Sequence, residues 1–247
     1  YLDRQGWWTE RLIALEMRLT TARQVDDCHD ERWCLAALGH TYGQLGYDDK
    51  GLDHYVQSLV RARELGDRKA EGAIMNNMSS IYRQQREYKL ALETYQQSLS
   101  IEREIGNRQG EGATLNNIGL LYWTQCEYDL ALQHYKQALP IAREVGIKME
   151  EGTILNNMAA IYCAQGKPTK AIEYYKKALV IAQEVGDRDG ETRICWNIGV
   201  DYNDMGDLTQ AEKYIALAVE IGEHISHPSL DEWRNGLEYV RAERRAG

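Results

Sequence analysis

The sequence predicts an all-α protein, an α-solenoid of antiparallel helix pairs that ends in a capping helix. The first observation is a repeat. The segment Glu111 to Gly146 recurs forty residues later at Glu151 and forty residues earlier at Glu71, with looser copies from Glu31 and Glu191. The second is the spacing of apolar residues within each copy, which is three and four, as on one face of a helix. A fixed period of this size is typical of arrays in which each repeat buries its apolar face against its neighbours.

Each repeat is predicted to contain two helices joined by a turn. In the copy from Glu111, the first helix places Leu115, Ile118 and Tyr122 on one face. A polar turn follows, and the second helix carries apolar residues at the same spacing: Leu130, Ala131, Tyr135, Ala138 and Leu139. We expect neighbouring copies to bury equivalent side chains: Leu115, Leu155, Tyr122, Tyr162, Ala131 and Ala171.

Residues 1–30 lie on the same forty-residue grid and are predicted to be a truncated repeat. Tyr1 and Leu2 match the end of a first helix, most of which is therefore missing, and we interpret the chain as a fragment of a longer protein. Trp7 and Trp8 then lie near a surface that the missing helix would cover. The alternative is that they form a patch for a partner or a second copy.

Five repeats follow, at residues 31–70, 71–110, 111–150, 151–190 and 191–228. The long helices end in glycine followed by Asp or Asn, as in Gly66-Asp67 and Gly186-Asp187, because glycine adopts the left-handed conformation and the polar residue caps the next helix. A glutamate then recurs near the start of each first helix, at Glu71, Glu111, Glu151 and Glu191. We expect these glutamates to serve helix-end electrostatics and solubility.

Residues 229–247 break the repeat and predict a closing helix. Trp233, Leu237 and Val240 fall on one face, and charged residues occupy the other. The end of an open stack requires such a polar outer face.

The repeat resembles the tetratricopeptide repeat family, whose pattern of small and large residues is met by Leu115, Gly119, Tyr122, Ala131, Tyr135 and Ala138. It departs from the common form in its forty-residue period, against about 34 residues in that form, and in having Arg143 in place of a late proline. This long form is similar to the repeats of kinesin light chain, of spindle-orientation adaptors and of the sensor arms of bacterial NB-ARC (STAND) signalling ATPases. The resemblance implies a right-handed superhelix with a concave groove lined by the first helices.

Composition restricts the class of partner. The 247-residue chain has a net charge of −9 and no basic stripe, which argues against nucleic-acid binding. Basic or neutral partners suit it better. There is no secretion signal and no apolar run of membrane-spanning length, so we expect a cytoplasmic protein that does not bind membranes.

The chemistry-bearing residues do not form a recognisable catalytic pattern. Five cysteines lack CxxC spacing and are predicted to be reduced and structural. Six histidines lack metal-ligand spacing, and no phosphate loop or nucleophile motif is present. We therefore expect no enzyme activity, no cofactor and no metal.

Asparagines recur on the predicted groove side of the first helices. One position reads Asn77, Asn117, Asn157 and Asn197, and the position before it reads Asn76, Asn116 and Asn156. Asparagine is a mediocre helix former, so this row calls for a further reason. A carboxamide can pair with both polar groups of a peptide unit, which predicts binding to the main chain of an extended ligand. The alternative is that these asparagines bond to the neighbouring repeat and fix the stack.

The other side chains expected on this strip are Arg83, Leu120, Trp123, Arg193 and Trp196. Two arginines are too few for a groove that clamps acidic chain ends. The tryptophans could anchor an apolar side chain of the ligand or pack between repeats.

These observations predict a non-catalytic interaction module that binds an extended peptide or a helix of a partner protein. One alternative is the sensor or regulatory arm of a larger STAND-type ATPase. Another is a scaffold that associates weakly with itself through its open N-terminal end.

Overall fold

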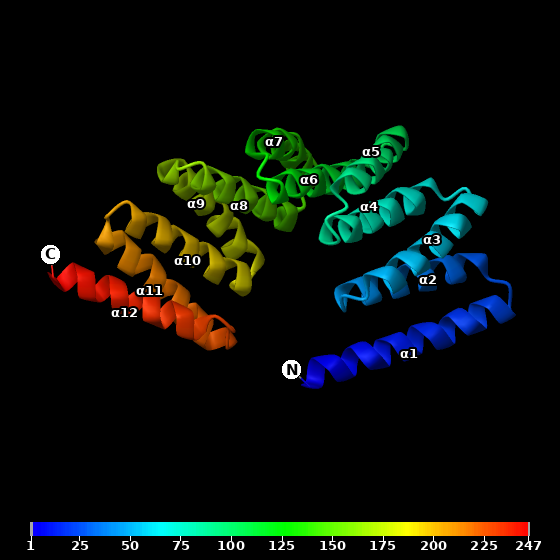
Figure 1. The fold of residues 1–247 in the computed structure, drawn as a ribbon, viewed down its shortest axis with the longest axis horizontal. Coiled ribbons are helices and arrows are strands. Elements are labelled where there is room, and N and C mark those ends of the chain that lie inside the picture. Colours follow the sequence, from blue (N-terminus) through cyan, green and yellow to red (C-terminus); the bar gives the residue numbers. More distant parts are fainter. Residues whose placement is uncertain (1, 247) are drawn as a thin grey trace. The chain divides into compact units, whose positions relative to one another are not determined.

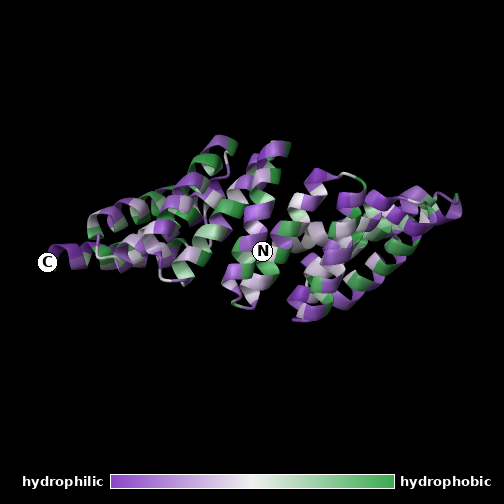
Figure 2. Ribbon diagram, turned by 90° about the horizontal axis from the view of Figure 1, so that it is seen from above, coloured by the Kyte–Doolittle hydropathy of each residue, from purple (hydrophilic) through white to green (hydrophobic). Residues whose placement is uncertain are grey.

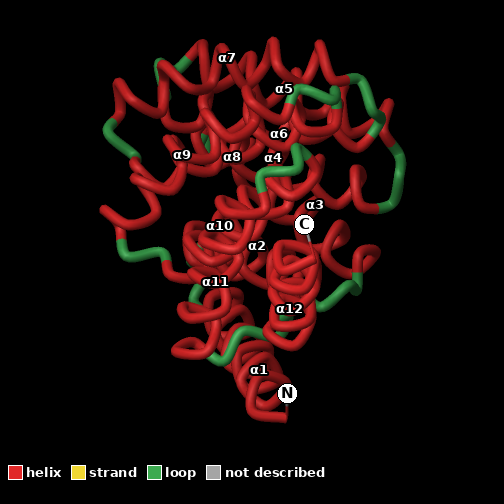
Figure 3. Tube along the Cα trace, turned by 90° about the vertical axis from the view of Figure 1, so that its left-hand side faces the viewer, coloured by secondary structure: helices red, strands yellow, loops and turns green. Residues whose placement is uncertain are grey.

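The structure, a computed structural model, describes residues 2–246, and these form helices joined by short turns, with no strand among them (Figures 1 and 3). The helices are α1 (Leu2–Gln24), α2 (Cys28–Gln44), α3 (Asp48–Glu64), α4 (Arg68–Gln84), α5 (Tyr88–Glu104), α6 (Arg108–Thr124), α7 (Tyr128–Val145), α8 (Lys148–Ala164), α9 (Pro168–Val185), α10 (Arg188–Asp204), α11 (Leu208–Ile225) and α12 (Leu230–Ala246). The expectation of an all-α chain is confirmed.

The chain divides into two compact units, Tyr1–Leu121 and Tyr122–Gly247, with the boundary inside α6. In the first unit, packing joins α1 to α2, α2 to α3, α3 to α4 and α4 to α5. In the second, each helix from α7 to α12 packs on the next. Each unit is therefore a stack of consecutive helices, which is the architecture of an α-solenoid.

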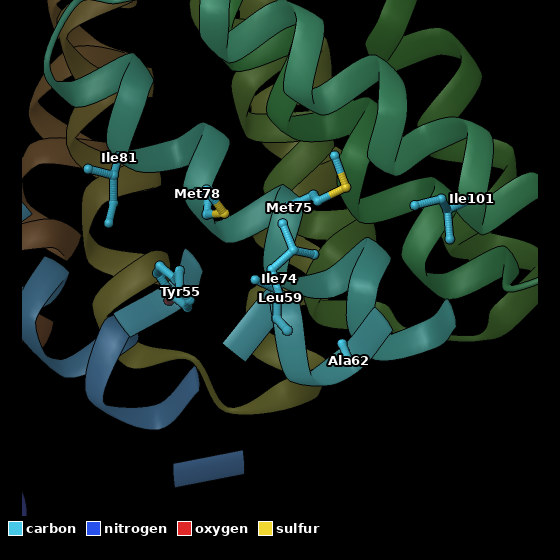
Figure 4. Close-up of a cluster of buried hydrophobic side chains, with 8 residues drawn as sticks. All are labelled: Tyr55, Leu59, Ala62, Ile74, Met75, Met78, Ile81 and Ile101. Atoms are coloured by element: carbon cyan, nitrogen blue, oxygen red, sulfur yellow. The ribbon is translucent and has the colours of Figure 1, made fainter. Parts of the chain in front are cut away.

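The core follows the predicted spacing. Hydrophobic and hydrophilic residues alternate along the helices (Figure 2), and the hydrophobic ones meet between helices. Figure 4 shows one such cluster in the first unit, to which α3 contributes Tyr55, Leu59 and Ala62, α4 contributes Ile74, Met75, Met78 and Ile81, and α5 contributes Ile101.

Five of the six side chains singled out for burial are buried: Leu115, Leu155, Tyr162, Ala131 and Ala171. Tyr122 is only half-buried. Its ring stacks on His134 with centroids 5.4 Å apart. Tyr82 and Tyr202, at the same repeat position, are likewise half-buried, so the full burial of Tyr162 is particular to its repeat.

The turn chemistry is as expected. Gly66, Gly106 and Gly186 have φ values of 65°, 68° and 72°, in the left-handed region. Asp67 and Asp187 then accept a hydrogen bond from the backbone N–H three residues later. Each such cap satisfies a helix amide that has no partner within its own helix.

The recurring glutamates are buried, so the expectation that they serve solubility is wrong. Glu71 is 6% exposed and accepts from Arg63 Nε at 2.8 Å and from Arg68 Nη1 at 2.5 Å. Burial would raise the pKa of Glu71, but the two arginines outweigh it and hold the pKa below its ordinary value. Two donors also reach each of the other members of the column: Glu31, Glu111, Glu151 and Glu191. For Glu31 the second donor is Arg61, and for Glu191 one donor is the neutral Gln183.

The N-terminal segment differs from its place on the repeat grid. Leu2 begins the helix α1, which continues to Gln24, and so does not end an earlier helix. Tyr1 lies outside the described residues. Within 2–24 there is no proline, and a single glycine inside a helix costs only about 1 kcal/mol, so local sequence does not stop the helix. Trp7 is exposed and meets Trp8 edge-on at 4.6 Å.

The last helix covers the preceding repeat. Trp233, Leu237 and Val240 of α12 are buried, as their shared face predicts. The ring of Trp233 stacks on His227 at 4.2 Å and on Trp196 at 6.0 Å. The exposed side of α12 is mostly charged, with Tyr239 the large apolar exception among its described residues.

Candidate functional site

The twelve predicted site residues lie on four of the first helices. Helix α4 carries Asn76, Asn77 and Arg83, α6 carries Asn116, Asn117, Leu120 and Trp123, α8 carries Asn156 and Asn157, and α10 carries Arg193, Trp196 and Asn197. None is buried, so all reach the surface at least in part. The boundary inside α6 places Trp123 and the residues of α8 and α10 in the second unit.

In the first unit the asparagines make contacts between helices. Asn117 Nδ2 donates to Asn76 Oδ1 at 3.2 Å, which joins α6 to α4. Burial raises the pKa of Tyr55, and a hydrogen bond from Asn77 partly offsets this effect. These asparagines therefore help to fix neighbouring helix pairs, the role that the sequence left open as an alternative.

Arg83 belongs to the same polar strip of the first unit. The hydroxyl of Tyr95 lies 2.8 Å from Ser80 Oγ. Burial raises the pKa of Tyr95, while hydrogen bonds from Ser80 and Arg83 oppose the rise. A row of buried tyrosines thus places its hydroxyls against the first helices, where they meet polar side chains.

In the second unit, the equivalent positions of the first helices line a cavity of about 280 Å³ between α8, α9 and α10. Four of the predicted residues line it: Asn156, Asn157, Arg193 and Asn197. The remaining lining is mostly apolar or small: Met149, Gly152, Thr153, Ala178, Ile181, Ala182, Val185, Asp187, Gly190 and Ile194. The structure thus brings asparagines of adjacent repeats together around one space.

The polar groups of this cavity are partly engaged already. Asn197 hydrogen-bonds to Tyr175, whose pKa is raised mainly by burial. Arg193 Nη2 lies 3.1 Å from Asp189 Oδ2, and both side chains are exposed. Asp187 Oδ1 accepts from the Gly190 amide at 2.9 Å as the cap of α10. The cavity therefore offers carboxamides, one capping carboxylate and a paired guanidinium beside an apolar wall.

The two tryptophans have aromatic neighbours within the chain. Trp196 stacks on Trp233 of the last helix, and a Cβ at Gly236 would come 2.6 Å from its ring. This favours the packing alternative for Trp196. Trp123 lies 5.4 Å from Tyr128, across the turn between α6 and α7.

Three residues that line the cavity, Asp187, Gly152 and Ala182, were not predicted from the sequence as part of the site. Asp187 was assigned only as a helix cap, yet it lines the cavity. The small residues Gly152 and Ala182, which leave the space open, resemble ordinary packing positions in the sequence. Comparing the residue at each position between successive repeats could have found them.

Residues 2–246 contain no group of three or more His, Cys, Asp or Glu side chains arranged to hold a metal ion. Within the same residues, no helix has the length and apolar character needed to cross a bilayer.

Comparison with known proteins gives one family. A model described as tetratricopeptide repeat matches residues 34–104, 71–144 and 150–224. Together these segments cover more than half of the chain. A search of curated proteins found no match.

Solved structures with similar folds share little sequence. BtubC (BKLC) from P. vanneervenii is 20% identical, with a TM-score of 0.78 over 89% of this chain and 92% of that one. A signal transduction ATPase with a tetratricopeptide repeat sensor from Pyrococcus horikoshii is 22% identical, with a TM-score of 0.79 over 92% of this chain and 35% of that one. The apo quorum sensor NprR from B. thuringiensis is 19% identical, with a TM-score of 0.72 over 98% and 67%.

Proposed function

Because the chain belongs to the tetratricopeptide repeat family, we propose that it is a non-catalytic interaction module that binds an extended peptide or a helix of a partner protein along its first helices. The cavity between α8, α9 and α10 is the observation that carries this proposal. It gathers Asn156, Asn157 and Asn197 beside an apolar wall. Side-chain pockets with adjacent carboxamides suit a peptide, whose main chain needs paired donors and acceptors.

The hydrogen bonds of Asn197, Asn117 and Asn76 use only part of each of these three carboxamides. Each carboxamide has two N–H donors and an oxygen that accepts two bonds. The bond of Asn197 to Tyr175 takes one donor, and the bond between Asn117 and Asn76 takes one donor and part of one acceptor. Asn197, Asn117 and Asn76 can therefore bond to a neighbouring helix and to a ligand at the same time.

The test is peptide selection followed by substitution. Peptides are selected from a displayed random library against the purified chain, and their affinity is measured by fluorescence anisotropy. Asn156→Ala with Asn157→Ala should weaken binding about ten-fold or more, since each neutral hydrogen bond contributes about 0.5–1.5 kcal/mol. Thermal melting should change little, because alanine is the better helix former.

Lys177→Ala is the matched control, because Lys177 lies exposed on α9 in an ion pair with Glu173. This variant should keep full affinity. Intact binding with lost stability in the asparagine variant would instead assign Asn156 and Asn157 to repeat stacking alone.

A sensor arm within a larger signalling ATPase is a second candidate. The likeness to the Pyrococcus horikoshii protein supports it, because this chain matches about a third of that protein. The full open reading frame decides between the two candidates. A nucleotide-binding segment in the same frame supports the sensor arm, and a frame that encodes only repeats supports a free adaptor.

A further inference from the structure

The cavity between α8, α9 and α10 has counterparts at two other repeat junctions, those of α2, α3 and α4 and of α4, α5 and α6, where side chains of the chain itself occupy the space. We propose that this cavity receives a basic side chain of the bound partner, with Asp187 as its counter-ion. The inference deepens the proposed function and rests on it, because the partner peptide supplies the side chain.

At the junction of α2, α3 and α4, a cation of the chain itself lies beside the capping aspartate. Arg32 Nε is 3.5 Å from Asp67 Oδ2, and the two side chains are 18% and 30% exposed. Arg32 and Asp67 occupy the repeat positions of Gly152 and Asp187. At this junction, the aspartate that caps the first helix of the following repeat therefore accommodates a guanidinium group.

At the junction of α4, α5 and α6, both partners change together. The cap is Asn107, whose Nδ2 donates to Glu102 at 2.6 Å. Glu102 is 2% exposed and occupies the repeat position of Ala182. A Cβ at Gly72 or Gly110 would lie 2.5 or 2.4 Å from its carboxyl group, so this side chain fills the space closely.

The two filled junctions follow one rule. Where the capping residue is an aspartate, which accepts, it faces the cationic Arg32, and where it is an asparagine whose amide donates, it faces the carboxyl group of Glu102. At the junction of α8, α9 and α10 the cap is the acceptor Asp187, but Gly152 and Ala182 remove the side chains that could meet it. Within the described part of the chain, Asp187 has no ion-pair partner, and one of its oxygens serves the Gly190 amide. The missing group is therefore a cation.

The charges around the cavity permit such a ligand. Arg193 also lines it, but its guanidinium is held by Asp189 at 3.1 Å. Asp189 in turn lies 3.3 Å from His227 Nε2. Asp187 is left as the unpaired charge, and a positive ligand group is favoured over a negative one.

The first test uses a matched pair of probes, Nα-acetyl-L-arginine N-methylamide and its citrulline analogue, which has the same shape without the charge. NMR titration follows the backbone amides of Gly190 and Asn197. The arginine probe should bind about three-fold or more tightly than the citrulline probe, as expected for a partly exposed charge pair. Equal binding of the two probes would overturn the inference.

Asp187→Asn should abolish this preference, since asparagine keeps the cap but not the charge. Asp207→Asn is the control, because Asp207 caps α11 in the same way and does not line the cavity. A preference that survives Asp187→Asn, or that is lost equally in Asp207→Asn, would contradict a specific role for Asp187.

A second variant fills the cavity from within. Gly152→Arg recreates the arrangement of Arg32 with Asp67 and should remove binding of the arginine probe. Gly152→Ala is its control, because the added Cβ lies 3.1 Å from Ile181 Cγ2 in both variants. If Gly152→Arg retains probe binding, the probe does not occupy this cavity. If it fails to fold, the Asp187 comparison decides.

The selected peptides separate this inference from the proposed function. A peptide whose affinity falls on replacing Asn156 and Asn157 but not in Asp187→Asn supports groove binding and refutes the basic-side-chain pocket. A peptide that is unaffected by either change refutes the groove itself.

Discussion

At the scale of single residues, buried carboxylates are distinguished by what they face. Glu71 lies between two arginines, which lower its pKa. Among the described residues, Glu102 has only Asn107 as a hydrogen-bond donor, and burial raises its pKa. The two residues are a turn or two from helix ends and nearly equally buried, so their opposite pKa shifts come from their neighbours.

Glu102→Gln should raise the melting temperature by a few degrees at pH 7. The pKa of Glu102 is higher in the folded chain than in the unfolded chain. Ionisation therefore costs stability, and the cost grows from the unfolded pKa up to the folded pKa and stays constant above it. Glutamine keeps the acceptor for Asn107 without the charge. Calorimetry across pH should show the difference shrinking toward pH 4, and a constant difference would contradict this origin.

Glu71→Gln should lower the free energy of unfolding by about 1–2 kcal/mol at pH 7, because it leaves two arginines facing a neutral group. The figure is below that of a fully buried pair, since both arginines are about half-exposed. A depressed pKa stabilises the fold above the unfolded pKa, and that contribution is lost as the pH falls through the folded pKa. Urea unfolding at pH 7 and pH 3 measures this: the variant and the natural chain should converge at the lower pH.

At the scale of elements, the turns inside the repeats differ in one residue. Gly46, Gly166 and Gly206 hold the left-handed position between first and second helices, while Arg86 and Cys126 take it with φ values of 63° and 60°. A side chain in this conformation costs about 1–2 kcal/mol, and glycine avoids the cost.

Arg86→Gly should therefore stabilise the chain by about 0.5 kcal/mol, once the greater freedom of glycine in the unfolded chain is subtracted. Gly166→Ala, the reciprocal change, should destabilise it by about 1 kcal/mol. Thermal melting of both variants checks the sign. Destabilisation by Arg86→Gly would show that the arginine side chain contributes more than its backbone strain.

The closing helix α12 also acts at this scale. Deleting residues 229–247 should lower stability markedly, because Trp233 and Leu237 are buried and each contributes roughly 1.5–3 kcal/mol. The loss also exposes Trp196, on which Trp233 stacks. Deletion from Arg245 onward, where the described side chains are exposed, is the control and should leave melting unchanged. Equal melting of the two truncated chains would count against a capping role.

At the scale of the whole molecule, each helix packs mainly on the helices next to it in sequence, and the chain forms two compact units. In such an array, stability is a sum of local terms and nearest-neighbour terms. Damage to one repeat should therefore act locally.

Leu38→Ala, at a fully buried position in α2, should cost about 2–5 kcal/mol and speed amide exchange in α1 to α3. Exchange in α9 to α11 should remain as in the natural chain. Ile198→Ala in α10, equally buried, should give the opposite pattern. Hydrogen exchange read by mass spectrometry checks both, and uniform acceleration across the chain would show a single cooperative unit instead.

Local sequence patterns predicted the helices from α2 onward, their order and their ends, whereas α1 departs from the repeat grid. Apolar spacing of three and four residues, and pairs such as Gly66-Asp67, act between close neighbours in the chain, so a local pattern predicts them. Local sequence does not predict what fills each junction, because that depends on side chains from three helices meeting in one space. Arg32 and Glu102 close two junctions, whereas Gly152 and Ala182 leave the third open beside Asp187. The packing of Trp196 on Trp233 was decided in the same way, by a contact between side chains far apart in sequence. In the glutamate column, Glu71 is buried although its arginine partners, Arg68 and Arg63, lie only three and eight positions away.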